Sequence, residues 1–197
     1  MIGSTAYIFG DEANLPPLVA EDLDAIALYL NFDMVASPNY VRFIYDGDGD
    51  AFGLEGPAGS ADIEDTFETF FSRRGLESEP TEFSGRSDYA AFIAPGVDIP
   101  SGGLFTGAEG IKTRLQEEIY GGTAGEQYDP CYHQACDDID NPDLEVFEQM
   151  IDAIAHAVLT YAFSTEGLEE MGSQSAQGSN GKAARAELER YGPSLVR

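Results

Sequence analysis

The sequence predicts an α/β fold with a mixed sheet between helices. Short apolar runs typical of buried strands recur along the chain, and segments with apolar residues at helical spacing accompany them. With 197 residues, of which 43% are hydrophobic, the chain is long enough to bury a core. We expect one domain over residues 1–163 and a tail over 164–197, rich in small and polar residues, with a short exposed helix at 183–191.

Three segments are predicted strands. Residues 26–33 form a nearly continuous apolar run that ends at Asp33. This run would place the Asp33 carboxylate at the carboxyl end of a strand, where open α/β sheets bind ligands. Residues 41–46 form a second short run, followed by an acidic turn over 46–50. A third strand is expected around residues 102–106, after two proline-containing turns.

Three helices accompany these strands. Ser60 is the expected N-cap of an amphipathic helix that Gly75 ends. A short helix is expected over 111–119. The longest helix is expected from Pro142 to about Ala162, because apolar residues recur there at helical spacing. These residues are Leu144, Phe147, Ile151, Ile154, Ala155, Val158 and Leu159.

The charge balance limits the classes of partner. The chain carries 36 acidic and 10 basic residues, a formal net charge of −26 at pH 7. Nucleic acids and anionic lipid surfaces are bound by clustered Lys and Arg, so neither is an expected partner. No run approaches the roughly 20 apolar residues that cross a bilayer, so no membrane span is expected. The two lysines, Lys112 and Lys182, are a small share of the basic residues, as in proteins from saline or secreted settings.

Cys131 and Cys136 lie close together in an irregular segment over 120–142. Their spacing favours a small disulfide loop or a metal site. A zinc site of four thiolates is excluded, because the chain has two cysteines and its two histidines are not in finger spacing. A disulfide would indicate an oxidising compartment. The first residues, however, show neither the basic nor the long apolar segment of a signal peptide, which conflicts with that indication.

The acidic turn over 46–50 resembles a calcium-binding loop, because its alternate aspartates could supply oxygens to a hard cation. An EF-hand loop needs glycine at its sixth position and glutamate at its twelfth. Ala51 and Pro57 occupy those positions here. The motif therefore fails, and a plain acidic turn is expected.

Three basic side chains are considered as functional residues. His133 lies between the two cysteines, in a loop that would fix its direction, and is either a ligand or an ordinary loop histidine. His156 lies among apolar residues of the last helix and is expected to be packed there. Arg86 follows Gly85 in a turn, where it is either a fork for a carboxylate or a surface partner of Asp88.

Five motifs occur in one order along the chain. They are residues 29–39 (YLNFDMVASPN), 85–89 (GRSDY), 102–108 (GGLFTGA), 121–125 (GGTAG) and 131–136 (CYHQAC). In this order they resemble the secreted, Streptomyces-type zinc aminopeptidases of the M28 family. The resemblance covers about residues 1–163. It implies the zinc-exopeptidase type of α/β fold, a three-layer αβα arrangement with a mixed sheet, and secretion of the protein.

The resemblance implies an enzyme that uses two zinc ions to remove N-terminal residues, preferably large apolar ones, from peptide substrates. By motif, Asp33 resembles the carboxylate ligand of one zinc ion and His133 the histidine ligand of the other. Asp33 would also meet the substrate's α-amine, and Tyr132 would hydrogen-bond the developing oxyanion. The implied substrate-binding positions are Gly85, Arg86 and Phe105.

Members of this family carry their other zinc ligands and the general-base glutamate upstream of the segment that matches residues 2–7 here. The pair Asp11 and Glu12 does not correspond to the family's adjacent glutamates, because it follows that segment. We therefore expect the C-terminal portion of a peptidase domain, inactive alone, with a missing N-terminal fragment as a candidate partner. The alternative is a non-enzymatic secreted protein that binds a peptide or an amino acid around Arg86, Phe105 and Tyr132.

Overall fold

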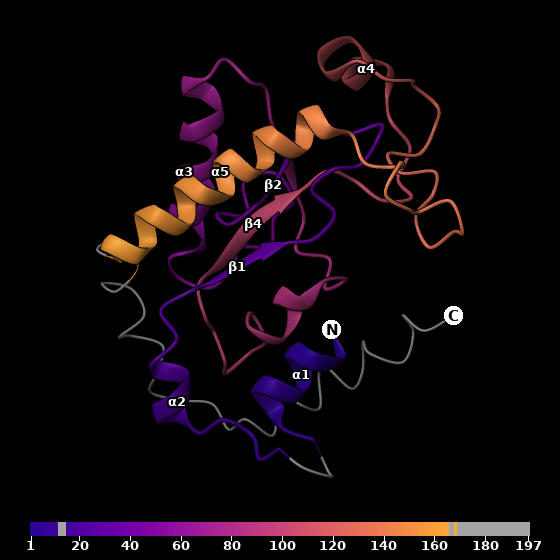
Figure 1. Ribbon diagram of the computed structural model, residues 1–197. Helices are drawn as coiled ribbons and strands as arrows, with labels where there is room; N and C mark the ends of the chain where they lie inside the picture. Colours follow the sequence, from indigo (N-terminus) through magenta and orange to yellow (C-terminus); the bar gives the residue numbers. More distant parts are fainter. Residues whose placement is uncertain (12–14, 166–167, 169–197) are drawn as a thin grey trace.

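Four short strands form one mixed sheet in the computed structural model, which describes residues 1–11, 15–165 and 168. The strands are β1 (Tyr29–Phe32), β2 (Phe43–Tyr45), β3 (Glu79–Thr81) and β4 (Ser101–Phe105), in the spatial order β1-β4-β2-β3 (Figure 1). β1 is parallel to β4, β4 is antiparallel to β2, and β2 is parallel to β3. The predicted mixed α/β sheet is thus confirmed, with β1 at one edge.

The helices precede, connect and follow the strands. They are α1 (Ile2–Phe9), α2 (Ala20–Asp24), α3 (Ser60–Arg73), the 3-10 helix η1 (Asp88–Ala91), α4 (Arg114–Tyr120) and α5 (Leu144–Phe163). In Figure 1, α3 and α5 lie together beside the sheet, and α1 lies away from them near the N-terminus. Within the described ranges, no helix has both the length and the apolar character that a membrane crossing requires.

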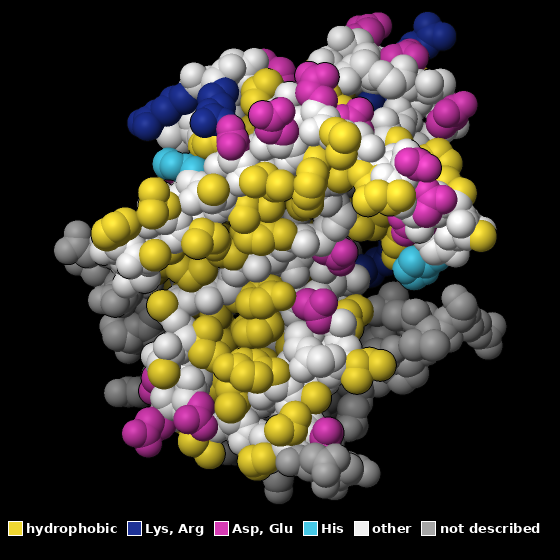
Figure 2. All heavy atoms as spheres, viewed as in Figure 1, with side chains coloured by type: hydrophobic (Ala, Val, Ile, Leu, Met, Phe, Trp, Pro, Cys, Tyr) yellow, Lys and Arg dark blue, Asp and Glu magenta, His cyan; other side chains and the backbone are white. Residues whose placement is uncertain are grey.

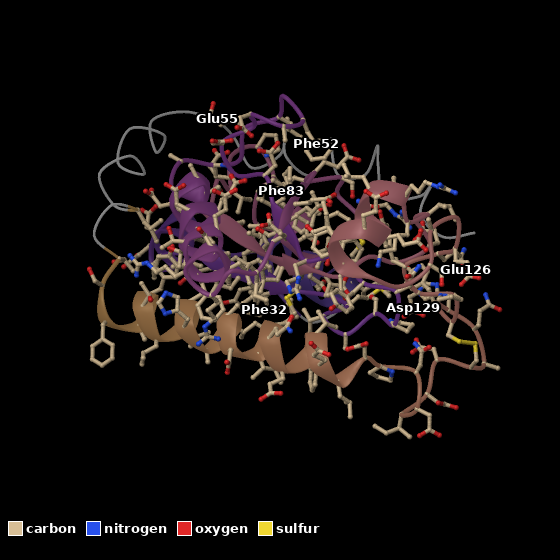
Figure 3. All side chains as sticks on the ribbon, turned by 90° about the horizontal axis from the view of Figure 1, so that it is seen from above. Phe32, Phe52, Glu55, Phe83, Glu126 and Asp129 are labelled. Carbon is tan, nitrogen blue, oxygen red and sulfur yellow. A yellow bond between two sulfur atoms is a disulfide. The ribbon has the colours of Figure 1, made fainter. Side chains whose placement is uncertain are left out.

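Strand side chains alternate between the two faces of the sheet, as the pleat requires. Leu30, Phe32, Ile44 and Leu104 belong to the core cluster that includes the buried side chains of α3 and α5. Tyr45 packs on the other face with Phe83 and Tyr89, the latter from η1. Figure 3 shows Phe32 close to α5 and Phe83 further from it. The sheet therefore has packed residues on both faces, with helices in each layer.

The buried face of α5 is not the face that the sequence predicted. Its fully buried residues are Val146, Met150, Ala153 and Ala157, which pack in the cluster with the phenylalanines of α3. Most of the expected apolar stripe faces outward instead: Leu144, Phe147, Ile151, Ala155, Val158 and Leu159 are exposed. Figure 2 shows apolar side chains gathered on this outward face. The helix is apolar on two sides, so spacing alone could not identify its buried side.

Several boundaries also differ from expectation. β1 starts at Tyr29, because residues 26–28 form the connection between α2 and β1. β3, which contains Pro80, was not predicted. Ser60 is the first helical residue and not the N-cap, which is Gly59. The Ser60 hydroxyl instead accepts a hydrogen bond from the Ser101 backbone N–H at 3.0 Å, which ties α3 to β4. Most of the predicted tail, including the helix at 183–191, lies outside the described residues.

Candidate functional site

Asp33 follows directly after β1, where the predicted strand end places it. The hydroxyl of the buried Ser87 donates to Asp33 Oδ2 at 2.6 Å, and Ser87 Oγ accepts from Asn31 Nδ2 at 3.0 Å. Asn31 lies on the same face of β1 and is itself buried. The exposed carboxylate of Asp33 is therefore oriented by the Ser87 hydroxyl, and the buried amide of Asn31 in turn fixes that hydroxyl.

The chain turns sharply after Asp33. Met34 has a φ of 56°, in the left-handed region that non-glycine residues rarely adopt. The Met34 carbonyl accepts hydrogen bonds from the backbone N–H of Thr106, at 2.8 Å, and from the Thr106 hydroxyl. Thr106 follows the end of β4, the neighbouring parallel strand. Two strand ends thus fix the turn that positions Asp33, and such a conformation is typical of functional sites.

Arg86 forms an ion pair with Glu109, with Arg86 Nη2 2.6 Å from Glu109 Oε1. The expected alternative, a pair with Asp88, is wrong. Asp88 Oδ1 instead contacts the Met1 amino group at 2.5 Å and accepts from Ser4 Oγ at 2.6 Å. α1 packs beside η1 through the apolar cluster that includes Ile8, Phe9 and Ala91. The guanidinium of Arg86 is thus left to Glu109.

Cys131 and Cys136 form a disulfide, so the alternative of cysteine metal ligands is wrong. The loop that it closes carries Tyr132 and His133, whose rings stack with centroids 4.0 Å apart. His133 has a φ of 57°, and its side chain is exposed. The buried Asp129 anchors the loop, because its Oδ1 accepts the Cys131 backbone N–H at 2.9 Å (Figure 3).

Tyr132 and His133 lie near the pair of Arg86 and Glu109. The hydrogen bond that the Arg86 guanidinium donates to Glu109 is the main cause that raises the pKa of Arg86, and the nearby Tyr132 adds to it. Burial alone would raise the pKa of Glu109. A hydrogen bond from its own backbone N–H, together with Arg86 and His133, holds that pKa below its usual value. Three segments therefore come together around the pair of Arg86 and Glu109: residues 85–87, 106–112 and 129–133.

The other predicted positions have mainly packing roles in this structure. Gly85 has a φ of 78°, and its N–H donates to the Tyr89 hydroxyl at 2.8 Å, which shapes the turn before Arg86. Phe105 is half-buried at the end of β4 and stacks on Phe43, with centroids 6.0 Å apart. His156 lies against Phe70 of α3, 5.2 Å between centroids, away from the converging segments.

The acidic turn is held by its own side chains. Buried Asp46 accepts the backbone N–H groups of Gly49 and Phe52 at 3.0 and 2.8 Å. Glu64 of α3, which the sequence did not single out, accepts those of Gly47 and Asp48 at 2.7 and 3.2 Å. Desolvation raises the pKa of Glu64 to about 7, despite these bonds. The turn therefore needs its acids to satisfy backbone donors.

Comparison with known proteins identifies the family. Residues 1–158 match peptidase family M28. The chain belongs to this family. The resemblance of its five ordered motifs is thereby confirmed.

Relatives of the M28 chain include well-matched aminopeptidases. It is 44% identical over 202 residues to an aminopeptidase of Pseudomonas aeruginosa, a match that covers 100% of this chain and 36% of that protein. It is 47% identical over 167 residues to leucine aminopeptidase 2 of Arthroderma otae, covering 85% of this chain and 32% of that protein. The chain thus spans about a third of the length of these relatives.

A solved structure supports the fold. The structure of BSAP, a zinc aminopeptidase from Bacillus subtilis, superposes with a TM-score of 0.51 at 20% identity. The superposition covers 73% of this chain and 30% of that one. The M28 chain therefore shares its α/β fold with this part of BSAP.

The donor set of this chain fits part of a zinc site. A carboxylate with one oxygen hydrogen-bonded and an exposed imidazole are both ordinary zinc ligands. In the part of the chain that the structure describes, however, one group of three potential ligands lies within 4.8 Å, and it is Asp46, Asp48 and Asp50. Asp33 and His133 belong to no such group. Because catalytic zinc normally takes three protein ligands, these two residues alone do not form a complete site.

Proposed function

We propose that this chain is part of a zinc-dependent aminopeptidase that removes N-terminal residues, preferably large apolar ones, from peptides. The observation that supports this most is the fixing of Asp33 by Ser87, whose own segment carries Arg86 toward Tyr132 and His133. Neighbouring loops of an M28 fold thus present a carboxylate that can bind a metal, Asp33, and a hydroxyl that can donate to an oxyanion, that of Tyr132.

Each residue has a role of its own in this proposal. Asp33 and His133 each ligate one of two zinc ions, and Asp33 also receives the α-amine of the substrate. Bound zinc lowers the pKa of water and polarises the scissile carbonyl. The Tyr132 hydroxyl donates to the oxygen on which negative charge develops. Gly85, Arg86 and Phe105 line the substrate side.

We further propose that the 197-residue polypeptide alone is inactive. Its two candidate ligands fall short of the three per ion that catalytic zinc takes, and a missing general base removes roughly 10²- to 10⁴-fold of rate. A complementing N-terminal fragment would supply the rest. Two features support such a partner. β1 lies at the edge of the sheet, where a further strand could pair with its backbone, and α5 exposes apolar side chains that another part of the protein could cover.

Secretion is part of the proposal. The disulfide between Cys131 and Cys136 supports it, because such bonds persist in oxidising compartments.

The test measures zinc and turnover on one sample. The purified 197-residue chain is dialysed, its zinc content is determined by elemental analysis, and hydrolysis of leucine anilide is assayed. We expect near zero zinc and no turnover. Adding the upstream part of an M28 domain should restore both, with turnover abolished by a chelator and by Asp33→Ala or His133→Ala.

Other outcomes contradict parts of this proposal. About two zinc ions per chain with turnover would show that inactivity is wrong. Activity that survives both substitutions would show that the ligand assignment is wrong. Chelator-insensitive binding of peptides, with no turnover even after complementation, would favour the non-enzymatic binding protein.

A further inference from the structure

The ion pair between Arg86 and Glu109 is half-exposed, with 51% and 42% of the side chains accessible. Pairs with that exposure usually contribute little, because two long side chains lose freedom and water screens their charges.

The backbone of Arg86 is fixed on both sides. The N–H of Gly85 donates to the Tyr89 hydroxyl at 2.8 Å. Ser87 is buried and hydrogen-bonded to both Asp33 and Asn31. The guanidinium of Arg86 therefore leaves the chain from a fixed point beside the proposed ligand Asp33.

The backbone of Glu109 is fixed in the same way. The carbonyls of its two neighbours, Ala108 and Gly110, accept the N–H groups of Asp129 and Tyr128, each at 2.9 Å. Both side chains thus extend from fixed backbone positions, and these positions bring the guanidinium and the carboxylate within 2.6 Å of each other.

The chemistry of the pair decides what Arg86 can do. A guanidinium presents planar N–H donors that match a carboxylate, and such forks bind free carboxylates in many proteins. Here the carboxylate already present is that of Glu109, at 2.6 Å. A substrate carboxylate would have to displace a partner that is tethered in place.

We propose that Glu109 is a specificity-determining residue that occupies the guanidinium fork of Arg86 and keeps a free substrate carboxylate out of it. This inference rests on the proposed function, in which Arg86 lines the substrate side. The favoured substrate then has a neutral peptide group near Arg86. Peptides whose terminal carboxylate falls there, as in dipeptides, are disfavoured.

The first experiment tests occupation of the fork without any peptide. The Arg86 Nε–H signal of the ¹⁵N-labelled full chain is assigned with Arg86→Lys and followed as sodium acetate replaces sodium chloride at constant ionic strength. In Glu109→Gln the signal should respond at least about threefold more than in the wild type. The matched control is Glu126→Gln, an exposed acid in the loop after α4, which should behave as the wild type does. Equal responses in wild type and Glu109→Gln, or no response in either, would overturn the inference.

The second experiment compares leucylglycine with leucylglycinamide, which differ in the charge of the C-terminal group. Affinities are measured for the full chain by NMR. In Glu109→Gln the affinity ratio should move toward the dipeptide by about three- to fivefold, with no change in Glu126→Gln. A loss of local structure would weaken both peptides alike and leave the ratio unchanged.

The two experiments separate the two proposals. An unchanged ratio in Glu109→Gln, with both peptides bound, overturns the role of Glu109 in specificity and leaves the substrate pocket standing. Binding of neither peptide by any form, even after the upstream part of an M28 domain is added, together with the expected acetate response, contradicts the substrate pocket and keeps the occupied fork.

Discussion

Ser87 joins a buried polar group to an exposed functional one. Its hydroxyl accepts from Asn31 and donates to Asp33, so one side chain both satisfies a buried amide and orients a carboxylate. We expect Ser87→Ala to lower the free energy of unfolding by about 1–3 kcal/mol, because the Asn31 amide loses its best partner in the buried layer. Urea unfolding measures this. Ser72→Ala, at an exposed site on α3, is the control and should change stability by less than about 0.5 kcal/mol.

Glu64 makes stability depend on pH. Its pKa is raised to about 7 in the folded protein, first by desolvation, with Asp48 and Asp46 adding repulsion. A raised carboxyl pKa favours the folded state below the unfolded value of about 4.3, and this contribution is lost as pH rises through about 7. We therefore expect the free energy of unfolding of the wild type to fall by an amount on the order of 3 kcal/mol between pH 4.5 and pH 8 because of Glu64. In Glu64→Gln this fall should be absent.

The measurement for Glu64 is urea unfolding at several pH values. Asp65→Asn is the control, because Asp65 is an exposed acid next to Glu64 on α3 and its substitution removes one carboxyl group in the same way. A wild-type profile parallel to that of Glu64→Gln across this window would contradict the assignment.

At the scale of elements, β4 and α3 approach each other through a glycine. A Cβ at Gly102 would lie 2.4 Å from Cγ2 of Ile63, which is fully buried in the core cluster. Gly102→Ala should therefore push α3 from the sheet and destabilise the fold by about 1–3 kcal/mol. Gly3→Ala in α1 is the control, because a Cβ there meets nothing within 4 Å. Equal midpoints of denaturation for wild type and Gly102→Ala would contradict the close approach.

The elements found from sequence are those with local signals. α3 and α5 have helical spacing over many residues, and Asp143 caps α5 through the N–H groups of Glu145 and Val146. β3 was missed because it is three residues long and contains Pro80, which is tolerated at a sheet edge. The role of Ser60 was wrong because its partner, Ser101, is 41 residues away. Long-range pairing leaves no local pattern.

The residues of the candidate site also divide into those that the sequence predicted and those that only the structure shows. Asp33, Tyr132 and His133 were found because motifs with recognisable residue order carry them. Glu109 was missed, because it lies one residue beyond the motif over 102–108, and its pairing with Arg86, 23 residues earlier, is seen only in the fold. Residues that bind directly thus tend to lie in motifs, while residues that position them are revealed by the fold.

At the scale of the whole molecule, the outward face of α5 exposes large apolar side chains that are not part of the core. Leu159 is 60% exposed and Phe163 is 84% exposed, along a helix whose opposite face is fully packed. An apolar stripe of this kind favours association, either with a partner or with other copies. The net charge of −26 opposes self-association at low salt and does so less as salt screens it.

We therefore expect the isolated chain to self-associate increasingly as salt is raised. The double substitution Val158→Glu and Leu159→Glu should shift its apparent mass in sedimentation toward that of one 21.2 kDa chain. Stability should change little, because both side chains are at least half-exposed. Met150→Ala is the contrasting variant: Met150 is fully buried on the same helix, so it should lose about 2–5 kcal/mol and leave the outward stripe intact. If the glutamates leave the apparent mass unchanged at high salt, this face does not drive association, and the exposed edge at β1 becomes the surface to test.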